Sequence, residues 1–394
     1  QKGIYKQPRL ESRFQYMGYK LGTRNLIGQA CVTSVLIDSR GWTWVGTDKD
    51  GLYSFDAKDQ PVFHYKENFP GTILSIAEDR QGHIWIGSYR EGCGWIDVSS
   101  HTFHRQQLPQ GGAVSIFDLE CDRQGNLWLG TMGEGLLRID NATREVKAYV
   151  SEENAVRDRK INTIINNYIS QLSLSPDGKR IYLATTMGVC CMEIATESWI
   201  KVFGANKLNY GTPTCIVREY NNKLWIGTNN GLYSYNLSTK ELRHLDMQKG
   251  LADNGIASIE QDQQGMIWVS TDHGLCCYNP KSQLTQSFFI DNGLQSNEFS
   301  DGASSISAQG TLIFGGVGGV TWFKPSDIKQ TDWKADVKLT AFSVNDELVT
   351  PETKSGWYHV TDTTVIASKR FVLSYSDNSF TIQLSTLTYD NPEH

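Results

Sequence analysis

Trp44-Val45-Gly46-Thr47, followed by Gly51-Leu52-Tyr53, is a phrase that recurs along this chain of 394 residues. Trp225-Ile226-Gly227-Thr228 and Gly231-Leu232-Tyr233 repeat it closely. Five further copies, two of them degenerate, occupy residues 85–92, 128–137, 182–190, 268–276 and 313–321. The glycine two residues after Trp44, Gly46, has its counterpart 41 residues later at Gly87. A strand-forming repeat of this length is typical of β-propeller blades.

Each copy contains four candidate strands. In the fifth copy these are residues 214–220, 224–228, 232–235 and 242–245, and Asn221-Asn222 forms a tight turn because Asn tolerates positive φ. The Trp of the second strand is expected to fill the wedge between neighbouring blades. The glycine after it is expected to let neighbouring backbones approach closely. The sequence therefore predicts an all-β fold, a seven-bladed β-propeller.

Three regions follow from the limits of the repeat. Residues 1–24 match the end of a preceding repeat, and residues 25–328 hold the propeller. The last copy lacks a fourth strand, so we expect residues 14–20 to supply it and close the ring, which removes exposed sheet edges. Residues 329–394 are expected to be the truncated start of an Ig-like β-sandwich.

The expected sandwich region contains three apolar runs. They are Val337–Asn345, Phe371–Tyr375 and Phe380–Leu384, and Asp377-Asn378 is the expected hairpin turn between the last two. Too few strands follow to complete a sandwich before His394.

Composition excludes several classes of function. The net charge is −6 without basic clusters, which argues against nucleic acid as a partner. No apolar run approaches the ~18 residues of a membrane-spanning helix, and no signal peptide is visible. The 8 Cys lie in or beside strands without CxxC spacing, which favours small buried hydrophobes over disulfides or metal ligands. We expect no catalytic residue, metal or cofactor in this chain.

The repeats resemble the regulator-type propeller repeats of hybrid two-component sensors from polysaccharide-degrading gut bacteria. Residues 291–299, Asp-Asn-Gly-Leu-Gln-Ser-Asn-Glu-Phe, are similar to the segment that enters the last blade in that family. Tyr375–Phe380 and Leu387–Pro392 resemble the opening of the Tyr-rich sandwich domain that follows such propellers.

The resemblance implies a periplasmic sensing module of a longer, membrane-anchored histidine kinase. It also implies an oligosaccharide ligand, control of polysaccharide-utilisation genes, and a homodimer through the sandwich domain in the parent protein. No phosphoacceptor His or ATP-site motif is present, so the chain itself is expected to have no kinase activity and to bind no nucleic acid directly.

Candidate ligand-binding residues lie in the loops between the second and third strands and in those that lead into the inner strands. Both sets belong to one face of a propeller, and planar polar and aromatic side chains suit sugars. The candidates are Asp48, Tyr89, Arg90, Glu91, Tyr210, Asn229, Asn230, Asp272, His273, Asn297 and Glu298. Tyr89, Arg90 and His273 are the strongest of them. Asp48, Asp50 and Glu91 could also suggest Ca²⁺, but their spacing matches no known calcium loop.

Two other functions remain open at this point. A propeller lyase or hydrolase acting on a polysaccharide would need a paired acid and base, for which Asp272-His273 is the one tempting pair. A non-catalytic scaffold for protein partners is the third possibility.

Overall fold

The computed structural model describes residues 14–18, 26–151, 164–204, 214–328 and 337–385. Residues 14–328 belong to one compact unit and residues 337–385 to a second. Tyr210, the end of the Tyr-rich resemblance at Leu387–Pro392, and the expected repeat tail before residue 14 lie outside the described residues.

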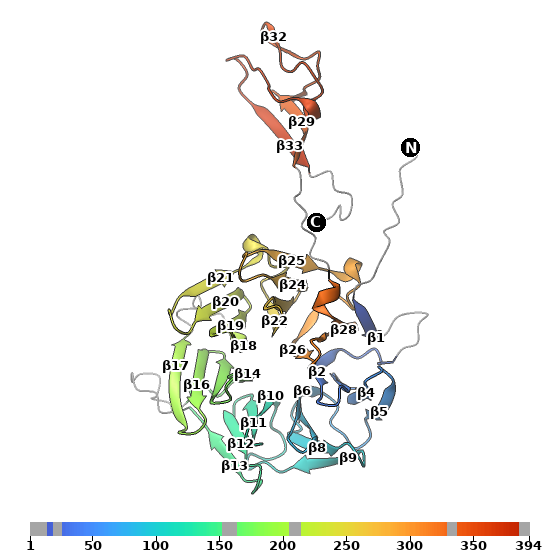
Figure 1. The fold of residues 1–394 in the computed structure, drawn as a ribbon, viewed down its shortest axis with the longest axis vertical. Coiled ribbons are helices and arrows are strands. Elements are labelled where there is room, and N and C mark those ends of the chain that lie inside the picture. Colours follow the sequence, from blue (N-terminus) through green and yellow to red (C-terminus); the bar gives the residue numbers. More distant parts are fainter. Residues whose placement is uncertain (1–13, 19–25, 152–163, 205–213, 329–336, 386–394) are drawn as a thin grey trace. The chain divides into compact units, whose positions relative to one another are not determined.

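Seven four-stranded antiparallel sheets make up the first unit, arranged as blades around a centre (Figure 1). The seven-bladed propeller expected from the sequence is confirmed. Blades 1 to 3 are β2(Val32–Ile37) to β5(Pro61–Tyr65), β6(Ile73–Glu78) to β9(Thr102–Gln106), and β10(Ile116–Cys121) to β13(Val146–Tyr149). Blades 4 to 6 are β14(Ile169–Leu174) to β17(Ser198–Gly204), β18(Thr214–Tyr220) to β21(Leu242–Leu245), and β22(Ile256–Gln261) to β25(Thr285–Phe288).

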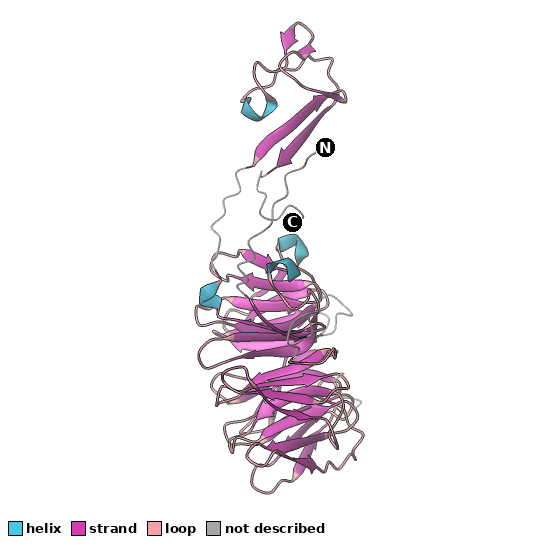
Figure 2. Ribbon diagram, turned by 90° about the vertical axis from the view of Figure 1, so that its right-hand side faces the viewer, coloured by secondary structure: helices cyan, strands magenta, loops and turns pink. Residues whose placement is uncertain are grey.

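The remaining strands of blades 1 to 6 follow in chain order. They are β3(Thr43–Thr47), β4(Leu52–Phe55), β7(Ile84–Ser88), β8(Cys93–Asp97), β11(Leu127–Thr131), β12(Leu136–Ile139), β15(Arg180–Thr185), β16(Gly188–Glu193), β19(Lys223–Thr228), β20(Gly231–Asn236), β23(Ile267–Thr271) and β24(Gly274–Tyr278). Among the described residues, helix is limited to single 3-10 turns such as η2(Met247–Lys249), η3(Ile290–Asn292) and η4(Pro325–Asp327), as Figure 2 shows.

The seventh blade joins the two ends of the propeller sequence. Its inner strands are β26(Phe299–Ile306), β27(Leu312–Gly316) and β28(Gly319–Phe323), and β1(Gln15–Gly18) pairs antiparallel with β28 as the outer strand. Met17 is opposite Val320 in this register and is buried. Residues 15–18 thus occupy the place that the sequence analysis assigned to the closing strand.

The repeated Trp residues pack as expected, each against the following blade. Trp44 is fully buried beside Ile84 and Ile86 of blade 2, and Trp128 is fully buried beside Ile181 and Leu183 of blade 4. The glycine two positions later makes room for an isoleucine. A Cβ on Gly46 would lie 2.8 Å from Cγ2 of Ile73 in the next blade. The close approach is therefore between the glycine and a side chain of the next blade, rather than between two backbones.

The Thr and the second Gly of the repeat also have a structural role. The Thr that ends the second strand donates its hydroxyl to the carbonyl of the glycine before the third, as in Thr47 to Gly51 at 2.8 Å and Thr228 to Gly231 at 2.9 Å. This bond closes the loop between the two strands. Asn221 and Asn222 have φ of 51° and 61°, which confirms the turn predicted from their identity.

The second unit contains β29(Lys338–Val344), β30(Glu347–Leu348), β31(Lys354–Ser355), β32(Tyr358–His359), η5(Val365–Ala367) and β33(Phe380–Ser385). Its expected hairpin is wrong. Residues 371–375 form no strand, and β33 pairs with β29 across a long stretch of sequence. Phe371 and Leu373 instead pack on the cluster around Phe342, while the Asp377 carboxylate accepts from the Ser374 amide at 2.9 Å.

Candidate functional site

The two sets of loops that carry the candidates are joined by backbone hydrogen bonds. The Asp48 amide donates to the Cys31 carbonyl at 2.9 Å, and the Tyr89 amide donates to the Thr72 carbonyl at 3.1 Å. The Asp272 amide donates likewise to the Gly255 carbonyl at 3.0 Å. Loops between the second and third strands therefore lie against the segments that enter the inner strands, on one face of the propeller.

Four candidates from blades 1 and 2 form a continuous group. The Tyr89 ring is 43% exposed, and the Arg90 guanidinium lies over it at 5.2 Å from the centroid. Arg90 has φ of 58° and its amide donates to the Ser115 hydroxyl at 3.1 Å. A Tyr-Arg pair held by its backbone in this way offers an aromatic face and several donors to a ligand.

The acidic members of this group have structural partners. The Asp48 carboxylate accepts from the Thr72 hydroxyl at 2.9 Å, and Thr72 also binds Tyr89 through its carbonyl. The Glu91 carboxylate accepts from the Gly71 amide at 3.1 Å. These two residues hold the loops in place, and their carboxylates keep free lone pairs for a ligand.

A second group lies where blades 6 and 7 meet. The pKa of Asp272 is raised by burial and then by the nearby charges of Asp253 and Glu298. Asn297 joins the group because its carbonyl accepts from the Gly274 amide at 2.6 Å. The His273 ring faces Phe289 at 5.7 Å. In the described part of the chain the Asp272 and His273 side chains share no hydrogen bond.

Asn229 and Asn230 lie on the loop between β19 and β20 of blade 5, and the Gly231 amide that follows them donates to the Asn254 carbonyl at 2.7 Å. The Asn230 carbonyl is hydrogen-bonded to the His244 ring at 2.6 Å, and the ring stacks on Tyr233 at 4.3 Å. The same arrangement recurs in blade 1, where His64 stacks on Tyr53 and contacts the Asp50 carbonyl at 2.7 Å. These histidines set the position of the loops.

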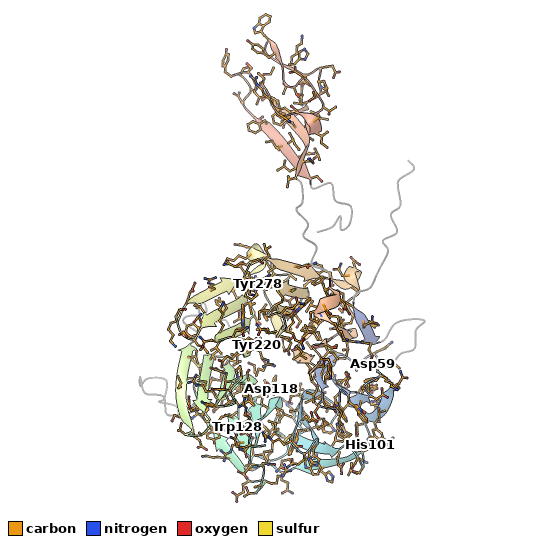
Figure 3. All side chains as sticks on the ribbon, viewed as in Figure 1. Asp59, His101, Asp118, Trp128, Tyr220 and Tyr278 are labelled. Atoms are coloured by element: carbon orange, nitrogen blue, oxygen red, sulfur yellow. The ribbon has the colours of Figure 1, made fainter. Side chains whose placement is uncertain are left out.

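A set of charged side chains around the centre of the ring was not predicted from the sequence. A cavity of about 620 Å³ lies among the inner strands, and Asp118, Glu120, Arg218 and Asp301 line it. Figure 3 places Asp118 and Tyr220 toward the centre of the ring and Trp128 farther out. Asp118 and Glu120 at alternate positions of β10, and Arg218 on β18, were visible as a signal, but strand alternation does not say which side faces the channel.

Burial shifts the protonation of these carboxyls. It raises the pKa of Asp118 to about 6, against the opposing effect of Arg218. Burial, together with the charge of Asp118, raises the pKa of Glu120 to about 8. Asp301 is open to water in the channel but has protein on most sides, and this desolvation raises its pKa to about 6. Near neutral pH the channel therefore holds carboxyls that readily exchange protons.

No group of three or more His, Cys, Asp or Glu side chains is arranged to hold a metal ion within the residues that the structure describes. The seven cysteines described there are free thiols, and five of them are buried. Across the same residues, no helix has the length and apolar character needed to cross a membrane.

Comparison with known proteins agrees with this architecture. Residues 69–90, 110–133 and 250–273 match the two component regulator propeller family. Histidine kinase P4 of Formosa agariphila is 24% identical over 402 residues, an alignment that covers 97% of this chain and 28% of that protein. The chain thus spans less than a third of the length of this relative.

Two solved structures share the fold. One is the extracellular domain of a protein of B. thetaiotaomicron described as a hybrid two component system, BT3049, with a TM-score of 0.70 and 20% identity over 87% of this chain and 45% of that one. The other is virginiamycin B lyase from Staphylococcus aureus, with a TM-score of 0.60 and 12% identity over 78% and 98% of the two chains. This chain is a seven-bladed β-propeller in which three segments match the two component regulator propeller repeat, and it shares its fold with the extracellular domain of BT3049.

Proposed function

We propose that this chain is the ligand-sensing, extracytoplasmic module of a membrane-anchored sensor histidine kinase, and that its ligand is an oligosaccharide. The repeat family and the fold shared with an extracellular sensor domain support the sensor role. A periplasmic location, control of polysaccharide-utilisation genes, and a homodimer through the region after residue 329 belong to the same proposal.

One observation carries the oligosaccharide proposal. Tyr89 and Arg90 present an exposed ring and a guanidinium side by side, and the strained φ of Arg90 fixes them on the loop face. Sugars offer apolar C–H faces to aromatic rings and hydroxyls to planar polar groups. The carboxylates of Asp48 and Glu91 on the same loops add acceptors for those hydroxyls.

Isothermal titration calorimetry with a panel of plant, host and microbial oligosaccharides tests the proposal. We expect saturable binding that is lost in Tyr89→Ala and in Arg90→Ala. Phe63→Ala is a matched control, because Phe63 is 42% exposed on the outer strand β5, away from the loop face. A folded wild-type protein that binds none of the panel, or binding that survives both loop variants, would contradict the proposal.

The enzyme alternative finds less support. The likeness to virginiamycin B lyase extends to the fold alone at 12% identity. His273 contacts Phe289, whereas the charges that act on Asp272 are those of Asp253 and Glu298. In a His273→Ala variant, loss of an oligosaccharide-cleaving activity would support the enzyme, whereas weaker binding without turnover would support the sensor.

A further inference from the structure

The channel at the centre of the propeller is lined by three carboxyl groups, those of Asp118, Glu120 and Asp301. Glu120 of β10 and Asp301 of β26 face it, and neither side chain has a hydrogen-bond partner among the described residues. Arg218 is the cation of the channel wall. Its Nη1 donates to the Leu172 carbonyl at 3.0 Å and to the Val217 carbonyl at 3.2 Å, and its charge acts on Asp118 and Glu120.

A buried acceptor lies in the wall of the same channel. Gln171 of β14 is 3% exposed, lines the channel, and its Oε1 has no hydrogen-bond partner. Its side chain reaches toward blade 7, where its Nε2 lies 3.6 Å from the position that a Cβ on Gly302 would take. Gly302 directly follows Asp301. An unpaired buried acceptor costs about 1–3 kcal/mol, which a donor from a ligand would recover.

Asp118 adds a third acceptor beside Gln171. Its carboxylate accepts from the amide of Leu172, the neighbour of Gln171, at 2.8 Å. It also accepts from the Leu119 amide at 2.9 Å, which leaves further lone pairs toward the channel. Gln171 is thus adjacent in the structure to Asp118 on one side and to the Asp301–Gly302 segment on the other.

These acceptors suit a charged donor without fixed coordination geometry. The described residues hold no ready-made metal cluster, and a metal ion needs its ligands at set distances. An ammonium group has three donors that rotate freely, and its charge is favoured beside several carboxylates. A cavity of about 620 Å³ has the size of an ordinary small-molecule site.

We infer that the central channel binds a small protonated primary amine, whose ammonium group donates to Gln171 Oε1 and to the carboxylates of Asp301 and Asp118. This inference goes beyond the proposed function, which places an oligosaccharide on the loop face. It stands or fails independently of that ligand.

Titration calorimetry and thermal denaturation at fixed ionic strength provide the test. The probe is 1,4-diaminobutane, and 1,4-butanediol is its neutral counterpart of similar length. We expect saturable binding and a higher Tm with the diamine and neither effect with the diol. Gln171→Leu and Asp301→Asn should each weaken diamine binding at least tenfold. Glu145→Gln removes the same charge from an exposed position on blade 3 and should leave binding unchanged.

Several outcomes would overturn the inference. They are the absence of diamine binding to the folded wild-type protein, equal binding of the diol, and affinity that both channel variants retain. Binding of Mg²⁺ in place of the diamine would also overturn it. Asp301→Asn preserves the size of the side chain, so it keeps the test valid if Gln171→Leu fails to fold. Tyr89→Ala should retain diamine binding, which separates failure here from failure of the oligosaccharide proposal.

Discussion

Replacing Asp122 by Ala should destabilise the propeller far more than a turn substitution normally does. Asp122 is 2% exposed, and its Oδ1 accepts from the backbone amides of Gln124 and Asn126 at 2.9 and 2.8 Å. Its Oδ2 accepts from the side chains of Trp128, at 2.9 Å from Nε1, and Asn126, at 3.0 Å from Nδ2. The substitution thus removes four hydrogen bonds to one buried carboxylate.

The magnitude follows from the donors left behind. The Nε1 group of the fully buried Trp128 loses its partner, which costs about 1–3 kcal/mol. The two backbone amides reach water at the edge of the turn and lose less. Because bonds to one acceptor are not additive, we expect the free energy of unfolding to fall by about 4 kcal/mol in total. Asp122→Asn should cost about 2 kcal/mol, since its Oδ1 can still accept from the amides while its Nδ2 opposes the indole N–H.

Urea denaturation followed by far-ultraviolet circular dichroism measures this loss without relying on Trp128 fluorescence. Asp56→Ala is the matched control. Asp56 accepts from the amides of Lys58 and Gln60 in a similar turn but binds no Trp, so its loss should be much smaller. Equal midpoints for the Asp122→Ala and Asp56→Ala variants at unchanged m-value would refute the link between turn and indole.

Three more outcomes are expected. Met17→Asp should lower the thermal midpoint, because it places a charge in the buried seam that β1 closes, and an unchanged scanning-calorimetry trace would count against ring closure by β1. The free energy of unfolding should fall between pH 4.5 and about pH 8, because folded Glu120 keeps a proton that the unfolded chain loses. In urea titrations, the fall of the Glu120→Gln variant over this pH range should be smaller than that of the wild type by about 1–3 kcal/mol. Cys190 and Cys276 should resist iodoacetamide in the native protein and react only in urea, as mass spectrometry would show, since both thiols are buried and burial raises the pKa of each.

The propeller could be predicted from the sequence because the features that define each blade lie close together in the chain. Strand composition, turns such as Asn221-Asn222, and the spacing of Trp and Gly are read within one blade. The bond from Trp128 to Asp122 also has a sequence signal, an Asp six residues before the Trp. It recurs at Asp38, Asp79 and Asp262, each of which accepts from the Trp of its own blade. The turn residue and the core residue were considered separately, so the hydrogen bond between them was not predicted.

The second unit shows where local reading fails. Residues 371–375 have the composition of a strand, but β29 pairs instead with β33 on one edge and with β30 on the other. Pairing depends on which strand reaches an edge, and this is a non-local choice that propensity does not encode. The candidate site, too, could be predicted from the sequence only in part. The loop face follows from topology, whereas the inward direction of Gln171 and Glu120 depends on how the blades tilt around the ring.

Repetition itself separates the residues that hold the ring together from those that are free to carry function. Where one blade meets the next, the same residues return, because Gly46, Gly87, Gly130 and Gly227 each admit an isoleucine of the following blade and a close-packed interface tolerates few shapes. The residue type at the inner-strand position opposite the Trp register varies from blade to blade. The position is occupied in turn by Leu36, Ala77, Glu120, Ser173, Arg218, Glu260 and Ser305. Four of these line the channel, among them Glu120 and Arg218. Glu120 and Arg218 occupy positions that the repeat leaves variable, so chemistry specific to this chain can accumulate there.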